Sequence, residues 1–119
     1  MFTLYNCVSA RSFRVLRMLQ ELALTYDLRV LAFPPRAQKK SFLELNPRGT
    51  VPLFVDGETR ITESAAICEC LTLRHSRGAL NVAADEPDFG NYLNFICTWR
   101  RDAHVSANAN VAVLAFRAC

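Results

Sequence analysis

The chain has 119 residues, of which 51% are hydrophobic and 21% are charged, and its formal net charge is +3. This length suits one domain with the start of a second, and the composition predicts a packed core. The basic residues are not interleaved with aromatic side chains, and no apolar run reaches the roughly 18 residues of a membrane span, so nucleic acid and membrane are excluded as partners.

The start of the chain predicts a strand, a helix and a second strand. Residues 2–6 (FTLYN) alternate apolar and polar side chains, as a short strand does. Residues 11–24 form an amphipathic helical pattern, and its apolar side chains are Phe13, Leu16, Leu19, Leu22 and Ala23. Residues 26–33 (YDLRVLAF) alternate again, with Leu28, Val30 and Ala32 on one face, and "PPR" then breaks the chain.

The following segments predict a helix, a hairpin and another helix. Residues 39–46 (KKSFLELN) read as one short helix closed by Asn46 and Pro47. "VPLFV" and "TRIT" flank Asp56-Gly57, a strong signal for a β-hairpin. The helix predicted at 63–75 has Ala66, Ile67, Cys70, Leu71 and Leu73 available for its buried side.

This order, β-α-β-α-β-β-α, predicts an α/β fold with a mixed sheet, because the first two strands are parallel and the hairpin is antiparallel. Residues 76–87 read as a linker rich in small and polar side chains, and a new helical pattern follows. That pattern decays beyond Trp99.

The opening residues lack a secretory signal. The five cysteines are odd in number and include no CxxC motif. Together these features predict a reduced, cytoplasmic protein.

Two features of residues 46–67 (NPRGTVPLFVDGETRITESAAI) indicate a site. Pro52 opens a strand, and a cis Val51–Pro52 bond would leave the Val51 amide and carbonyl free to pair with an extended peptide, although a trans bond is favoured from sequence alone. Glu63 and Ser64 open a helix, where free amides and the dipole favour an anion. The pair could hold both charges of an α-amino acid group, or it could simply cap the helix.

With "LYNCVSARSFRVL" before it, this stretch resembles the amino-terminal, thioredoxin-like domain of a bacterial cytosolic glutathione transferase. The resemblance covers residues 2 to about 75, and the pair "NPxGxVP" and "ESAAI" carries it. It implies a four-stranded mixed sheet and a cis Val51–Pro52 bond. It further implies that Val51 pairs with the cysteinyl part of glutathione and that Glu63 and Ser64 hold the γ-glutamyl end, with no metal.

A glutathione transferase must stabilise a thiolate, and the resemblance locates the donor at the first strand–helix junction. Alignment puts Ser9 where serine-using classes carry the activating hydroxyl, whereas Cys7 falls where cysteine-using members place theirs. Tyr5 lies one residue early for the tyrosine classes. The alternatives are that Ser9 or Ser12 only caps the helix, and that Cys7 is a buried strand-end thiol.

Basic residues extend the predicted glutathione site. Arg11 lies in the first turn of the helix, where a cation is disfavoured unless negative charge is near, so it indicates a neighbouring thiolate or is simply solvated. Arg36, Lys39 and Lys40 lie where family members often bind the glycyl carboxylate, and Lys40 is included in the predicted site.

The resemblance predicts a thioredoxin-like domain at 1–76, a linker at 77–87 and, from 88 to 119, the start of a truncated all-helical domain. In full-length members that domain supplies the electrophile pocket and much of a homodimer contact. A one-base shift in a sequence encoding "HVSANA" (104–109) can read Thr-Phe-Pro-Gln-Thr, with which family members continue, so we hypothesise a lost frame near Cys97 to Arg101. The expected function is conjugation of glutathione, as co-substrate, to a small electrophile; the alternative is a glutathione-binding module without efficient transfer.

Overall fold

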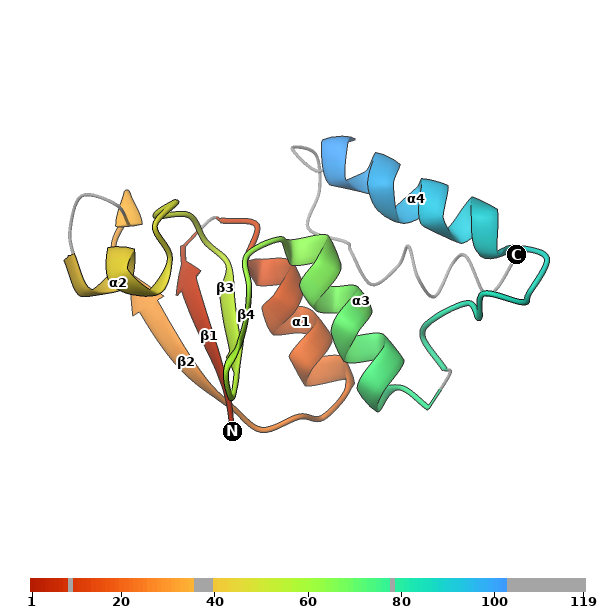
Figure 1. Ribbon diagram of the computed structural model, residues 1–119, viewed down its shortest axis with the longest axis horizontal. Coiled ribbons are helices and arrows are strands. Elements are labelled where there is room, and N and C mark those ends of the chain that lie inside the picture. The colour runs from red at the N-terminus through yellow and green to blue at the C-terminus, as the bar shows by residue number, and fades with distance from the viewer. Residues whose placement is uncertain (9, 36–39, 78, 103–119) are drawn as a thin grey trace. The chain divides into compact units, whose positions relative to one another are not determined.

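The computed structural model describes residues 1–102 except 9, 36–39 and 78, and it describes side chains as far as Thr98. The chain divides into two compact units, Met1–Cys68 and Glu69–Cys119, and each is described by itself. The elements in chain order (Figure 1) are β1 (Phe2–Cys7), α1 (Phe13–Glu21), β2 (Tyr26–Leu31), α2 (Lys40–Leu45), β3 (Leu53–Asp56), β4 (Thr59–Ile61), α3 (Ser64–His75) and α4 (Phe89–Asp102).

The four strands form one mixed sheet in the order β2-β1-β3-β4. β1 runs parallel to β2 and antiparallel to β3, and β3 and β4 form the hairpin. The predicted α/β, thioredoxin-like fold is therefore confirmed. The two-residue loop of the hairpin is Gly57–Glu58, because Asp56 pairs with Thr59, so the turn begins one residue later than Asp56-Gly57 suggested. Gly57 has φ +58°, a conformation that glycine adopts without a steric penalty.

Alternation along the central strands divides the first unit into two apolar layers. Leu4 and Phe54 pair across β1 and β3 and are buried on one face, where the Phe2 ring lies 5.4 Å from that of Phe54. Tyr5 and the buried Cys7 point to the other face, where they pack with Phe42 of α2. Accordingly, α1 and α2 lie on opposite sides of β1 (Figure 1).

The buried face of α1 differs from the predicted one. Of the five apolar residues expected there, only Leu19 is buried, and Phe13 is 50% exposed. The buried residues of the helix are Arg14, Val15, Met18 and Leu19. The helix forms as expected, but the apolar pattern predicted the wrong buried face. The long aliphatic stem of Arg14 can be buried beside apolar side chains, so a charged residue lies on the face that meets the sheet. Ala23, with φ 50°, follows the helix end.

Exposure of other predicted elements also reflects their place in the fold. Leu28 and Val30 share a face of β2 as predicted, yet they are 38% and 58% exposed because β2 is an edge strand. In α3, Ile67 and Leu71 are buried as expected, whereas Leu73 is 59% exposed.

The helix predicted after the linker is present in the second unit as α4, and it extends three residues past Trp99, where the sequence pattern decays. Tyr92 of this helix is 3% exposed, and its hydroxyl donates a hydrogen bond to the Glu69 carboxylate. The residues beyond 102, including the hypothesised frame-shifted tail, lie outside the described part of the chain.

Candidate functional site

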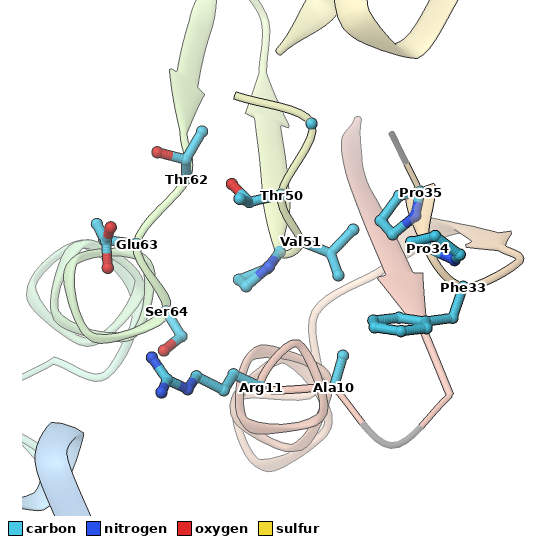
Figure 2. A pocket seen from close by; sticks show the side chains of 12 residues that line it. Ala10, Arg11, Phe33, Pro34, Pro35, Thr50, Val51, Thr62, Glu63 and Ser64 are labelled. Carbon is cyan, nitrogen blue, oxygen red and sulfur yellow. The ribbon is translucent and has the colours of Figure 1, made fainter. Parts of the chain in front are cut away.

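A cavity of about 360 Å³ lies in the first unit, at the end of the sheet where β1 and β2 finish and β3 begins. Its lining residues are Ala10, Arg11, Phe33, Pro34, Pro35, Gly49, Thr50, Val51, Pro52, Thr62, Glu63 and Ser64. They come from four separate stretches of sequence, as Figure 2 shows. Polar side chains lie on one side of the cavity, and Phe33, Pro34 and Pro35 lie on the other.

The Val51–Pro52 peptide bond is cis. The trans bond favoured from sequence alone is therefore wrong, and the cis bond implied by the resemblance is confirmed. Pro52 is buried and Val51 is half-buried, so the backbone of Val51 meets the cavity immediately before β3. A strand end in this position presents amide and carbonyl groups that an extended peptide can pair with.

Asn46 holds the loop that leads to Val51, a role that the sequence analysis missed. This side chain is 3% exposed, and its amide donates to the Thr50 carbonyl at 2.8 Å. Its side-chain oxygen accepts from the Arg48 amide at 3.2 Å, and its own carbonyl accepts from the Gly49 amide at 2.9 Å. An asparagine at the end of a short helical pattern and directly before Pro47 was the signal that could have indicated this role, because asparagine side chains often bond to the backbone two residues on.

Glu63 and Ser64 meet the cavity at the amino end of α3. The Glu63 carbonyl accepts the Ile67 amide at 2.9 Å, so the helix begins here and the amides of its first turn have no partner within the helix. Ser64 is 5% exposed, whereas the Glu63 side chain is exposed. Figure 2 shows the Arg11 side chain extending toward Ser64. A hydroxyl, helix amides and a guanidinium in one corner can bind a carboxylate.

The basic residues of the predicted site are distributed unevenly. Arg11 lines the cavity, whereas Lys40 is exposed and is absent from its lining. Arg36 and Lys39 lie outside the described residues. Arg11 also affects the neighbouring Arg14, whose pKa is lowered mainly by burial and further by the positive charge of Arg11.

The candidate thiol activators differ in their surroundings. Cys7 is 1% exposed and lies outside the cavity lining; its thiol faces the Ala32 carbonyl, with 3.8 Å between sulfur and oxygen. Burial raises the pKa of the Cys7 thiol, so this side chain is neutral near pH 7. Ser9 lies outside the described residues. Tyr5 packs its ring 5.5 Å from that of Phe42, away from the cavity.

Ser12 precedes α1 but makes no side-chain cap hydrogen bond to it, so the interpretation of Ser12 as a helix cap is wrong. Its hydroxyl instead accepts from the Cys7 amide at 3.4 Å and donates to the side-chain oxygen of Asn6. The Cys7 amide and the Asn6 side chain, both at the end of β1, engage this hydroxyl in place of the amides of the first turn of α1.

The described residues contain no group of three or more His, Cys, Asp or Glu side chains arranged to hold a metal ion. No helix among them is both long and apolar enough to cross a membrane.

Comparison with known proteins identifies a family. The family described as "Glutathione S-transferase, N-terminal domain" matches residues 8–73. Glutathione S-transferase F4 of Arabidopsis thaliana is 38% identical over 82 residues, covering 66% of this chain and 34% of the relative. This chain spans about a third of the length of the curated relatives that it matches.

Solved structures show the same fold. A glutathione transferase of Methylococcus capsulatus matches with a TM-score of 0.76 at 21% identity, covering 87% of this chain and 53% of that chain. Human glutathione transferase theta-2, solved in complex with glutathione, matches with a TM-score of 0.74 at 19% identity, covering 85% of this chain and 42% of that chain.

Proposed function

The chain belongs to the family of glutathione S-transferase N-terminal domains, and we propose that its cavity binds glutathione for transfer of the thiolate to small electrophiles. One observation carries this proposal: Val51, Pro52, Glu63 and Ser64 line a single hollow, although they come from two separate stretches of the sequence. A tripeptide needs such a hollow, with a strand end for its backbone and an anion-binding corner for its terminal carboxylate.

In the proposed complex, each part of glutathione has a partner. The γ-glutamyl carboxylate binds the Ser64 hydroxyl, the first amides of α3 and the Arg11 guanidinium. The γ-glutamyl ammonium pairs with Glu63, and the cysteinyl backbone pairs with Val51. Lys40 is proposed for the glycyl carboxylate, where its exposure leaves it free to reorient.

Thiolate formation is assigned to Ser9 in this proposal. A free thiol with a pKa of about 8.5 is only a few per cent ionised at neutral pH. A hydrogen bond to the charged sulfur contributes about 1.5–3 kcal/mol, which lowers the thiol pKa by roughly one to two units. Cys7 is the alternative donor, but its burial and its raised pKa favour Ser9.

The whole protein is proposed to be a bacterial, cytoplasmic homodimer. The thioredoxin-like domain spans 1–76, the linker spans 77–87, and the helical segment from 88 begins the domain that supplies the electrophile pocket. The curated relatives support a second domain because they are about three times as long as the part matched here.

Titration of the purified chain with glutathione, read by calorimetry and thermal shift, tests the first half of this proposal. Conjugation of glutathione to a chloro-nitroaromatic tests the second half. Saturable binding and conjugation are expected, and S-methylglutathione should bind without reacting. Saturable binding with no conjugation would favour the module that only binds glutathione, and no binding would overturn the proposal.

A further inference from the structure

Strand β2 forms one edge of the sheet (Figure 1), with β1 on one side and no described strand on the other. It has six residues, whereas β4 at the opposite edge has three. A long edge strand presents backbone amides and carbonyls with which another strand can pair, and short edges, proline and lysine usually prevent such pairing. The sequence of β2, YDLRVL, contains neither proline nor lysine.

The two faces of β2 carry different side chains. Leu28 and Val30 share one face and are 38% and 58% exposed. Asp27 and Arg29 share the other face, where their side chains are 32% and 62% exposed. The Nε of Arg29 donates to the Asp27 carboxylate at 2.7 Å. Within the described part of the chain this guanidinium makes no other hydrogen bond, so its two terminal nitrogens can donate to a second carboxylate.

A hollow of about 390 Å³ lies beside this edge, between β2 and α2. Arg29 and Leu31 line it from the strand, and Ser41, Phe42 and Leu45 line it from the helix. The side chains of α2 therefore leave room beside Arg29. On this side of the sheet, the guanidinium has space to turn toward a carboxylate of an added strand.

The sequence of β2 is complementary to a second copy of itself. When two such strands pair antiparallel with Leu28 opposite Leu28, Asp27 of each strand lies opposite Arg29 of the other. The same register brings Tyr26 opposite Val30. Opposing residues lie on the same face of a sheet, so both ion pairs form on one face and the apolar contacts form on the other.

We propose that two copies of the chain associate through β2, in the register centred on Leu28, so that their four-stranded sheets become one. The interface is symmetric, with the same surface used by both copies. Charges of a single sign on this edge would repel a second copy, whereas alternating Asp27 and Arg29 attract one. No residue of β2 lines the cavity, so this association is independent of glutathione binding and of the contact expected from the helical domain.

A charge swap tests the interface. Asp27→Lys leaves two positive charges on each strand, and Arg29→Glu leaves two negative charges. In either variant alone, like charges oppose each other twice in the dimer, and its Kd should rise at least about tenfold. An equal mixture of the two variants places opposite charges at both positions, so heterodimers should form with the Kd of the unmodified dimer. Sedimentation velocity measures the Kd, and native mass spectrometry identifies the heterodimer by its mass.

Two further sets of variants control this test. Glu21→Lys reverses one charge of the exposed Arg17–Glu21 pair on α1, which is matched in character but lies outside β2, and it should leave the Kd unchanged. Leu28→Lys and Leu28→Glu should each weaken the dimer, because each opposes like charges at the centre of the interface, and their mixture should restore it. This second swap keeps the test decisive if Asp27→Lys does not fold, as measured by circular dichroism.

A concentration-dependent dimer that is lost in the single variants and restored in the mixtures is the expected result. An unmodified chain that stays monomeric at every concentration would overturn the proposal. A dimer that persists unchanged in the variants of β2 would assign the contact to another surface and overturn it as well. Loss without restoration in either mixture, or equal loss in Glu21→Lys, would contradict the paired register.

Discussion

The Cys7 thiol donates to the carbonyl oxygen of Ala32, 3.8 Å away, at the point where the parallel strands β1 and β2 end side by side. Cys7 is 1% exposed in the layer formed with Leu31, Phe42 and Leu53. Burial disfavours the charged thiolate form of Cys7 and therefore raises the pKa of this thiol. Its chemistry is that of a core side chain.

Alkylation should accordingly spare Cys7. At neutral pH in the folded protein we expect Cys97, which is exposed, to react with iodoacetamide at least about tenfold faster than Cys7, because only an accessible thiolate reacts. Peptide mass spectrometry after timed labelling measures both rates. In denaturing urea the rates should converge, and comparable rates in the folded protein would contradict the burial of Cys7.

The raised pKa of the Cys7 thiol also predicts how the stability of the fold changes with pH. Above the ordinary thiol pKa, Cys7 loses its proton in the unfolded chain but keeps it in the folded one, so the folded state binds more protons and stability falls as pH rises. The free energy of unfolding from urea titrations should decrease from pH 8 to 10 by more in the unmodified chain than in Cys7→Ala. Equal slopes would contradict this prediction.

Replacing Ser9 by alanine should abolish most thiolate formation and preserve binding. The hydroxyl is assigned to the sulfur, whereas binding is assigned to Val51, Glu63 and Ser64. The thiol pKa should rise by roughly one to two units, with the Kd for S-methylglutathione unchanged. Cys7→Ala is the comparison: loss of the ultraviolet thiolate signal there, with Ser9→Ala unaffected, would transfer the role to Cys7.

Glu63→Gln should weaken glutathione binding by about 1–3 kcal/mol, because the γ-glutamyl ammonium would lose its charged partner. Glu58→Gln removes the same charge from the hairpin loop outside the cavity, and it should leave the Kd unchanged. Isothermal titration calorimetry measures both variants. If Glu63 only begins α3, its substitution will barely alter affinity and will slightly lower the melting temperature instead.

Two phenylalanines offer a matched test of the fold. Phe42 is 2% exposed and Phe33 is 77% exposed. Phe42→Ala should lower the free energy of unfolding by about 3–5 kcal/mol because it leaves a cavity beneath α2. Phe33→Ala should change it by less than about 0.5 kcal/mol, as surface substitutions generally do. Urea titrations followed by circular dichroism measure both, and similar losses would contradict the described core.

Much of the fold follows from local patterns in the sequence. Alternation predicted β1 and β2, helical spacing predicted α1 and α3, and Asp56-Gly57 predicted the hairpin, which together require a mixed sheet. These features are local, because strand and helix periods and turn residues depend on neighbours within a few positions. The segments around Pro52 and Glu63, together with residues 4–16 before them, likewise carried the family resemblance.

Other features were decided only by the tertiary structure. A helical period does not specify which side of α1 meets the sheet, and so Arg14 is buried while Phe13 is half exposed. The two partners of the Ser12 hydroxyl lie five and six positions away, at the end of a strand. Arg11, Val51 and Ser64 share a cavity only because the chain folds back on itself. Contacts between distant segments set helix phase, side-chain partners and cavity shape, and no local period encodes them.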